Sequence, residues 1–237
     1  MKHIRIIPLY IAFSSIAAVL LIFIVGTISS QASPLSVSEK IGIASVFILC
    51  CVIGISFTVR PNWTRRYFHK VKNEEKDTQS LRQRFFRGHH PDCLAFQNHT
   101  IYWRKKTWCA GCLGLFIGLC ASIILMILYL RTDFQPTRMI SLALLLIGLF
   151  ILAVVYIEIL HRSKRATVHV FINSLLPLSF LSITIAVGGA TREFIYCLFS
   201  ILLCFLWLDT RVQLSKSHHR SLCRNCVESC KMFTASV

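Results

Sequence analysis

The chain has 237 residues, of which 55% are hydrophobic and only 15% are charged, and its mean hydropathy is +0.63. This composition excludes a water-soluble globular protein, a disordered chain and a small secreted disulfide protein. Lys and Arg number 26 against 10 Asp and Glu, a formal net charge of +16. An apolar chain with this charge is expected to be a membrane protein whose loops face anionic lipid or an acidic partner.

Six segments without internal charge are candidates for membrane-spanning helices, because an apolar helix needs about 20 residues to cross the hydrocarbon core. They cover residues 6–27, 41–59, 110–130, 139–157, 168–187 and 194–208. The last segment is short, and we expect Trp207 to support it at the membrane interface. This order predicts two spans in residues 1–59, a basic loop in 60–109, four spans in 110–208 and a tail in 209–237.

The distribution of Lys and Arg predicts the orientation of these spans. Of the 26 basic residues, 22 fall at the amino terminus, in the loops after the second and fourth spans, or in the tail. The other side holds only Lys40, Arg131, Arg138 and Arg192. Basic residues concentrate in cytoplasmic loops. We therefore expect a multi-pass protein of the plasma membrane with both termini in the cytoplasm.

The first span also resembles a secretory signal peptide. Lys2 and Arg5 precede the apolar run, and the small residues Ser30 and Ala32 follow it. The apolar stretch is longer than that of a typical signal peptide, so we favour a retained helix. Cleavage would leave the orientation of the other spans unchanged.

A pattern typical of a zinc site begins in the basic loop. His90 and Cys93 form an H-x-x-C pair, and Cys109 and Cys112 form a C-x-x-C pair at the predicted start of the third span. Zinc favours tetrahedral sites built from two such pairs, because a two-residue spacer lets both side chains face one metal ion. The residues between the pairs are rich in strand formers and predict a small ribbon. We therefore predict zinc at these four residues, with iron as the alternative metal.

A second cluster, in the tail, contains His219, Cys223, Cys226 and Cys230. These residues would form a metal site of their own, with His218 as a substitute for His219, or the two C-x-x-C pairs would share one metal ion. Disulfides are not expected, because all eleven cysteines lie in predicted spans or on the predicted cytoplasmic side. The alternative to metal binding is reduced, partly buried thiols, which is the role expected of the cysteines inside the spans.

The centre of the chain resembles the predicted membrane proteins called domain of unknown function 2085, which have a His-Pro segment and then Cys-Ala-x-Cys-x-Gly entering a helix. The matching residues are His89-His90-Pro91-Asp92-Cys93, then Cys109-Ala110-Gly111-Cys112-Leu113-Gly114 and Gly118. That family has no assigned activity, so the resemblance implies a membrane protein and no particular reaction. This chain has Gly88 where the family often has Cys, and Gly111 where Arg is common. These differences leave the fourth metal ligand open, with His89 or His99 as substitutes for His90.

Small and polar residues inside the spans indicate how the helices pack. Gly114 and Gly118 form a G-x-x-x-G face that permits close contact with another helix. Asn173 and Pro177 predict a kink in the fifth span, with an interhelical hydrogen bond as the simpler role of the amide.

The basic loop predicts contact with anionic lipid headgroups. Leu81 and Phe85 are four residues apart and would share a helical face, while Arg82, Arg84 and Arg87 would reach lipid phosphates. No RNA or DNA motif accompanies the charge, so we favour membrane lipid, and a protein partner in a membrane complex, over nucleic acid.

The predicted fold is an all-α integral membrane protein: a six-helix transmembrane bundle with a small metal-stapled cytoplasmic loop. Three functions fit it: a scaffold or accessory subunit of a membrane complex, a metal-handling or iron-based redox protein, and a lipid-phase enzyme acting near Glu158 and His161. For Glu158, His161 and His169, at the ends of the fourth and fifth spans, an ion pair or an interfacial contact is favoured over metal or haem ligation. We favour the scaffold, because a metal closed by four protein ligands leaves no open position for catalysis.

Overall fold

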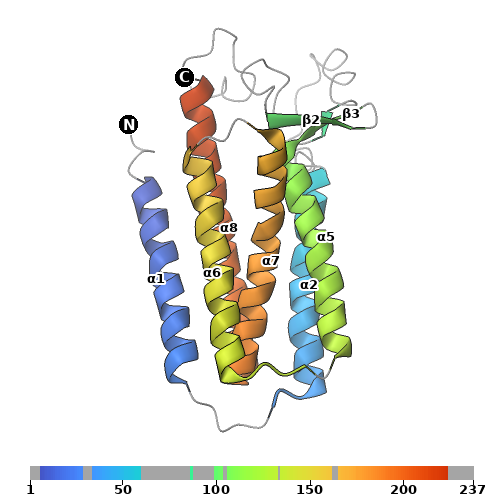
Figure 1. Cartoon of the computed structure of the whole chain (residues 1–237), viewed down its shortest axis with the longest axis vertical. Coiled ribbons are helices and arrows are strands. Elements are labelled where there is room, and N and C mark those ends of the chain that lie inside the picture. The colour runs from blue at the N-terminus through green and yellow to red at the C-terminus, as the bar shows by residue number, and fades with distance from the viewer. Residues whose placement is uncertain are drawn as a thin grey trace, which may run out of the picture.

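The computed structural model describes residues 6–28, 34–59, 86–87, 99–103, 106–132, 134–161 and 165–223. Its elements, in chain order, are α1 (Ile6–Thr27), α2 (Val37–Val59), β1 (Phe86–Arg87), β2 (Thr100–Trp103), β3 (Lys106–Cys109), α5 (Ala110–Arg131), α6 (Arg138–His161), α7 (Ala166–Thr191) and α8 (Phe194–Cys223). Figure 1 shows the helices side by side, with the strands across one end of the bundle. We call the end at which β2 and β3 lie the hairpin end.

Among the residues that the structure describes, six helices are long and apolar enough to cross a membrane, as predicted, which is the organisation of a multi-pass membrane protein. α8 continues past residue 208, the predicted end of the last span, to Cys223, and its apolar part reaches Ser217. Trp207, Thr210 and Leu214 recur at helical spacing and are all buried. This continuing apolar face keeps α8 packed against the bundle beyond the predicted end.

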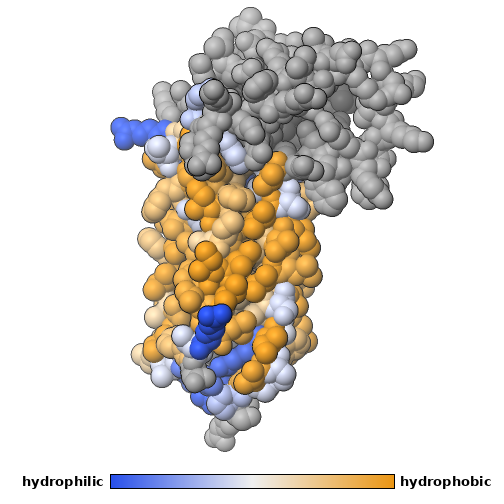
Figure 2. All heavy atoms as spheres, turned by 90° about the vertical axis from the view of Figure 1, so that its right-hand side faces the viewer, coloured by the Kyte–Doolittle hydropathy of each residue, from blue (hydrophilic) through white to orange (hydrophobic). Residues whose placement is uncertain are grey.

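The ends of the helices divide the charged residues between the two ends of the bundle. α1 starts and α8 finishes at the hairpin end, whereas Lys40, Arg131, Arg138 and Arg192 lie at the opposite end. This division agrees with the predicted separation of charges, and the assignment of the hairpin end to the cytoplasm stays a prediction. Between the ends, exposed apolar side chains form a band, which Figure 2 shows on the face formed by α2 and α5.

The central helix is α7, which has the largest buried share of any apolar span and packs against both α5 and α6. Glycines make the α5 contact close. A Cβ atom on Gly114 would overlap the carbonyl oxygen of Val170, and one on Gly118 would overlap the carbonyl oxygen of Ser174. The predicted glycine face is therefore confirmed: the two backbones touch along it, and it fixes the start of α5 beside the start of α7.

Hydrogen bonds attach α1 to α8. The hydroxyl oxygens of Ser14 and Thr210 lie 2.7 Å apart, and the Trp207 indole Nε1 donates to the Ser14 carbonyl oxygen at 3.1 Å. Tyr156 on α6 donates its hydroxyl to the Trp207 carbonyl oxygen at 2.9 Å. Trp207 is completely buried between these partners, which corrects its predicted place at the membrane interface. The core holds it because both its ring and its N–H group are satisfied there.

The strands form a three-stranded sheet in the order β1-β3-β2. β2 and β3 are antiparallel, with Thr100 opposite Cys109 and Trp103 opposite Lys106, so the predicted ribbon is confirmed. The parallel strand β1, in which Arg87 is opposite Trp108, was not predicted, and the fold is not purely helical. β3 ends at Cys109 and α5 begins at Ala110, so the hairpin passes into a membrane helix without a linker.

Candidate functional site

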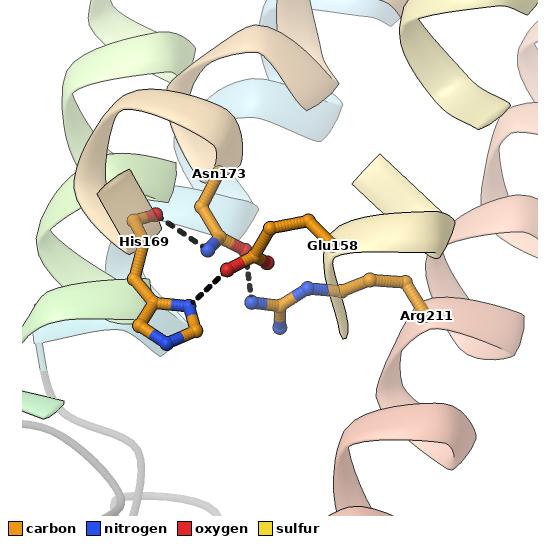
Figure 3. A network of polar contacts seen from close by, with 4 residues as sticks. All are labelled: Glu158, His169, Asn173 and Arg211. Atoms are coloured by element: carbon orange, nitrogen blue, oxygen red, sulfur yellow. Dashed lines mark hydrogen bonds and ion pairs between the residues drawn. The ribbon is translucent and has the colours of Figure 1, made fainter. Parts of the chain in front are cut away.

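A network of polar side chains joins three helices at the hairpin end of the bundle (Figure 3). Glu158 comes from α6, His169 and Asn173 come from α7, and Arg211 comes from α8. His169 and Asn173 are four residues apart, so helical geometry places both on one face of α7. The network therefore depends on the packing of three segments that are distant in the sequence.

The centre of the network is a buried contact between the Glu158 carboxylate and the His169 imidazole. Glu158 Oε1 lies 2.7 Å from His169 Nδ1, and the two side chains are only 6% and 14% exposed, respectively. This contact brings the two expected partners together, and it is an ion pair when the imidazole is protonated. His161, the last residue of α6, has no described side chain, so its predicted role stays untested. Removing either partner would be costly, because it would leave an uncompensated group in a low-dielectric interior.

Asn173 connects this pair to Arg211. The Asn173 amide Nδ2 donates to the carbonyl oxygen of His169 at 2.6 Å, and its Oδ1 accepts a hydrogen bond from Arg211 Nη2. Asn173 is 2% exposed. The predicted interhelical hydrogen bond of Asn173 is therefore confirmed.

The network leaves some polar atoms without direct hydrogen bonds. Within the part of the chain that the structure describes, both carboxylate oxygens of Glu158 and the Nε atom of Arg211 are buried and have no hydrogen-bond partner. Figure 3 shows the Glu158 carboxylate between His169 and Arg211. The carboxylate and the guanidinium interact through their opposite charges, which offsets part of the cost of burying both.

Arg211 also connects the network to the C-x-x-C pair at the start of α5. A Cβ atom on Gly111, between the two cysteines, would lie 3.3 Å from Arg211 Nη2 and 3.9 Å from Asn173 Nδ2. Arg211 interacts electrostatically with both Cys112 and Cys109. Cys109 is 4% exposed and Cys112 is half-buried. The guanidinium thus lies beside the two cysteines that are predicted to bind metal.

The hairpin brings a second histidine to the same place. The rings of His99 and His169 have centroids 4.5 Å apart and are tilted by 42°. His99 directly precedes Thr100, which is opposite Cys109 in the sheet. The structure therefore gathers His99, Cys109, Cys112, His169 and Arg211 at the junction of hairpin and bundle.

The predicted metal sites are only partly within the described residues. His90, Cys93, Cys226 and Cys230 lie outside them, and His219 and Cys223 lie on the last turns of α8, where only the backbone is described. Among the residues that the structure describes, no three His, Cys, Asp or Glu side chains are grouped closely enough to hold a metal ion. Of the predicted metal ligands, only Cys109 and Cys112 have described side chains, and the zinc site stays a prediction.

Arg211 was not predicted as a site residue, because it lies in the segment 209–237 that was predicted to be a tail. One feature of the sequence could have indicated that Arg211 belongs to the bundle. Trp207, Thr210 and Leu214, which are all buried, recur at helical spacing and continue the helix through position 211. An arginine that continues an apolar helix must find partners inside the protein or reach water. Here it finds Asn173.

Comparison of the chain with protein-family models, with curated proteins and with solved structures finds no match. The resemblance of the central segment to domain of unknown function 2085 therefore stays a prediction. The fold itself defines the class, a multi-pass membrane protein with a small sheet at one end of its bundle.

Proposed function

We propose that the protein is a scaffold or accessory subunit of a membrane complex, in which a structural zinc site orders the cytoplasmic face that a partner binds. One observation carries this proposal: the C-x-x-C pair lies across the junction of the hairpin and α5. Cys109 ends β3, and Cys112 is in the first turn of α5. A metal bound there would hold the hairpin at a fixed angle to the bundle, because metal binding to such residues contributes directly to folding.

The register of the sheet supports His90 and Cys93 as the remaining ligands. β1 runs parallel to β3, and Arg87 is opposite Trp108. β1 therefore ends opposite Trp108, one residue before Cys109, and runs in the same direction as β3. His90 and Cys93 follow Arg87 within six residues, which is short enough for them to reach the same metal ion.

Charge balance also supports a thiolate site. Three thiolates and one histidine on Zn²⁺ carry a net negative charge, and Arg211 beside Gly111 is placed to compensate it. Glu158 is paired with His169 and interacts with Arg211, so it holds helices together. This use of Glu158 favours the scaffold over a lipid-phase enzyme that would need its carboxylate for chemistry.

The metal is tested on the full chain purified from native membranes. We expect about one zinc ion per chain, lost in Cys109→Ser and Cys112→Ser, because each change removes one of four ligands. Cys120→Ser, which removes a half-buried thiol further along α5, is the matched control and should keep its zinc. Wild-type protein without zinc, or equal zinc in all variants, would contradict the proposal. Iron in place of zinc would favour the redox alternative.

The partner is tested by reversing the charges of Arg82, Arg84 and Arg87 together. If this basic segment binds a partner or anionic lipid, co-purification should weaken, and the wild-type association should decrease between low and moderate salt. Cys109→Ser should weaken it as well, whereas Glu158→Gln should leave it intact. If co-purification is unchanged by salt and by Cys109→Ser, the scaffold proposal is ruled out. Loss of a lipid-modifying activity in Glu158→Gln would favour the enzyme.

A further inference from the structure

The length of α5 sets the level of the hairpin relative to a membrane. α5 is a candidate span of 22 residues. At about 1.5 Å per residue its length is about 33 Å, close to the roughly 30 Å thickness of the hydrocarbon core. The helix therefore needs its whole length to cross, and it ends at the charged residue Arg131. Its first residue, Ala110, then lies at the boundary between hydrocarbon and headgroups.

No linker separates the hairpin from this boundary. β3 ends at Cys109, and α5 begins at Ala110. These two residues are 4% and 0% exposed, and Gly114, one turn further along, touches the backbone of α7. Figure 1 shows β2 and β3 lying across this end of the bundle. The packed junction therefore holds the hairpin at the level of the lipid headgroups.

The register of the sheet identifies the face of the hairpin that turns toward the bundle. Thr100 is opposite Cys109, and residues two apart in a strand point the same way, so Thr100, Tyr102 and Cys109 share one face. Cys109 is buried on this face and interacts with Arg211 of α8. The shared face is therefore directed toward the bundle at the junction.

Tyr102 lies on this same face but nearer the tip, where the bundle no longer covers it. Its side chain is 74% exposed, the most exposed aromatic side chain among the residues that the structure describes. Ile101, on the other face, is half-buried opposite Trp108. Tyrosine is enriched at membrane interfaces, because its ring is apolar and its hydroxyl is polar. Tyr102 thus presents an interfacial side chain at the level of the headgroups.

The turn of the hairpin has a composition that agrees with this location. In the sequence, Arg104, Lys105 and Lys106 directly follow Trp103, and residues 99–109 contain no Asp or Glu. Basic residues beside an anionic leaflet are attracted to its headgroups. The turn therefore combines the aromatic and basic residue types that occur at membrane interfaces.

We propose that the β2–β3 hairpin anchors the protein in the headgroup layer of the bilayer, with Tyr102 inserted among the lipids that surround α5. The anchor would fix the depth at which α5 begins. This inference rests on α5 as a membrane span and not on the zinc site, so a chain without zinc would leave it standing.

The test uses the full chain with Tyr102 replaced by the photo-reactive amino acid p-benzoylphenylalanine, in vesicles of phosphatidylcholine and phosphatidylglycerol. Illumination should attach lipid to the protein, and mass spectrometry measures the adduct. The same replacement at Ile101 is the matched control, because Ile101 is the neighbouring residue on the other face of the hairpin. We expect at least about five-fold more lipid adduct at Tyr102 than at Ile101, because side chains of successive strand residues point to opposite faces.

A replacement at Phe150, which is 70% exposed on α6, shows whether the helices face lipid at all. Lipid adducts at Phe150 but none at Tyr102 would overturn the proposal, as would equal adducts at Tyr102 and Ile101. Crosslinking of Tyr102 to another protein in native membranes would assign this surface to a partner and would also overturn it. Circular dichroism checks that each variant keeps the helical content of the wild type.

Discussion

The contact of α5 with α7 and the contact of α1 with α8 are built in different ways. At Gly114 and Gly118 there is no room for even a methyl group against the backbone of α7. At Ser14 the contact with α8 consists of hydrogen bonds to Thr210 and Trp207. Lipid is as apolar as the helices, so burial of apolar surface alone does not hold membrane helices together. Close packing holds the first pair, and a few polar groups hold the second.

This comparison predicts the largest effect at the glycines. Gly114→Leu and Gly118→Leu should each destabilise the protein by about 3 kcal/mol, the upper end of the cost of overpacking a well-packed contact. Unfolding in sodium dodecyl sulfate, followed by circular dichroism, measures the change. Gly26→Leu on α1 is the control and should cost little, because nothing lies within 4 Å of a Cβ atom at that position. Equal losses at all three glycines would show that close α5–α7 packing is unimportant.

An intermediate effect is expected where the polar network attaches α8 to α7. Asn173→Leu keeps the size of the side chain but leaves the buried Arg211 without its hydrogen-bond acceptor, which should cost about 2 kcal/mol. The same unfolding measurement applies. Ser174→Ala is the matched control, because the Ser174 hydroxyl bonds only to the Phe171 carbonyl oxygen of its own helix. If the two variants unfold alike, the network does not stabilise the bundle.

The smallest effect is expected on α1. Ser14→Ala removes the hydrogen bond to Thr210, which should cost about 0.6 kcal/mol, the average for interhelical hydrogen bonds in a membrane protein. A double-mutant cycle with Thr210→Val isolates this pair. Ser56→Ala, which removes a bond within α2, is the control. A cost in Ser14→Ala as large as that of the glycine variants would erase the distinction between the two contacts.

Much of the helical architecture was predictable because it depends on local composition. The predicted spans agree with the helices except for the last, and the glycine face and the ribbon were both found in place. The length of α8 and the burial of Trp207 were missed for one reason. Charges at Asp209 and Arg211 end the hydropathy signal, although Trp207 and Leu214 continue the buried face of the helix.

The candidate site was predictable only in part. Cys109 and Cys112 are found where expected, at the start of α5, because their spacing and the adjacent apolar run are both visible in the sequence. The partners of Cys109 and Cys112 were not predictable. Arg211 lies almost one hundred residues beyond them, and no local pattern relates a residue on α8 to the first turn of α5.

The sequence by itself determined that the chain has six segments long and apolar enough to cross a membrane, because each contains about 20 apolar residues without internal charge. It also determined which face of α5 can pack closely against the backbone of another helix, because Gly114 and Gly118 lie on that face. Only the tertiary structure decided that Glu158, His169, Asn173 and Arg211 meet. The physical reason is that their meeting depends on how α6, α7 and α8 pack, and that packing is set by contacts between segments that the sequence keeps far apart.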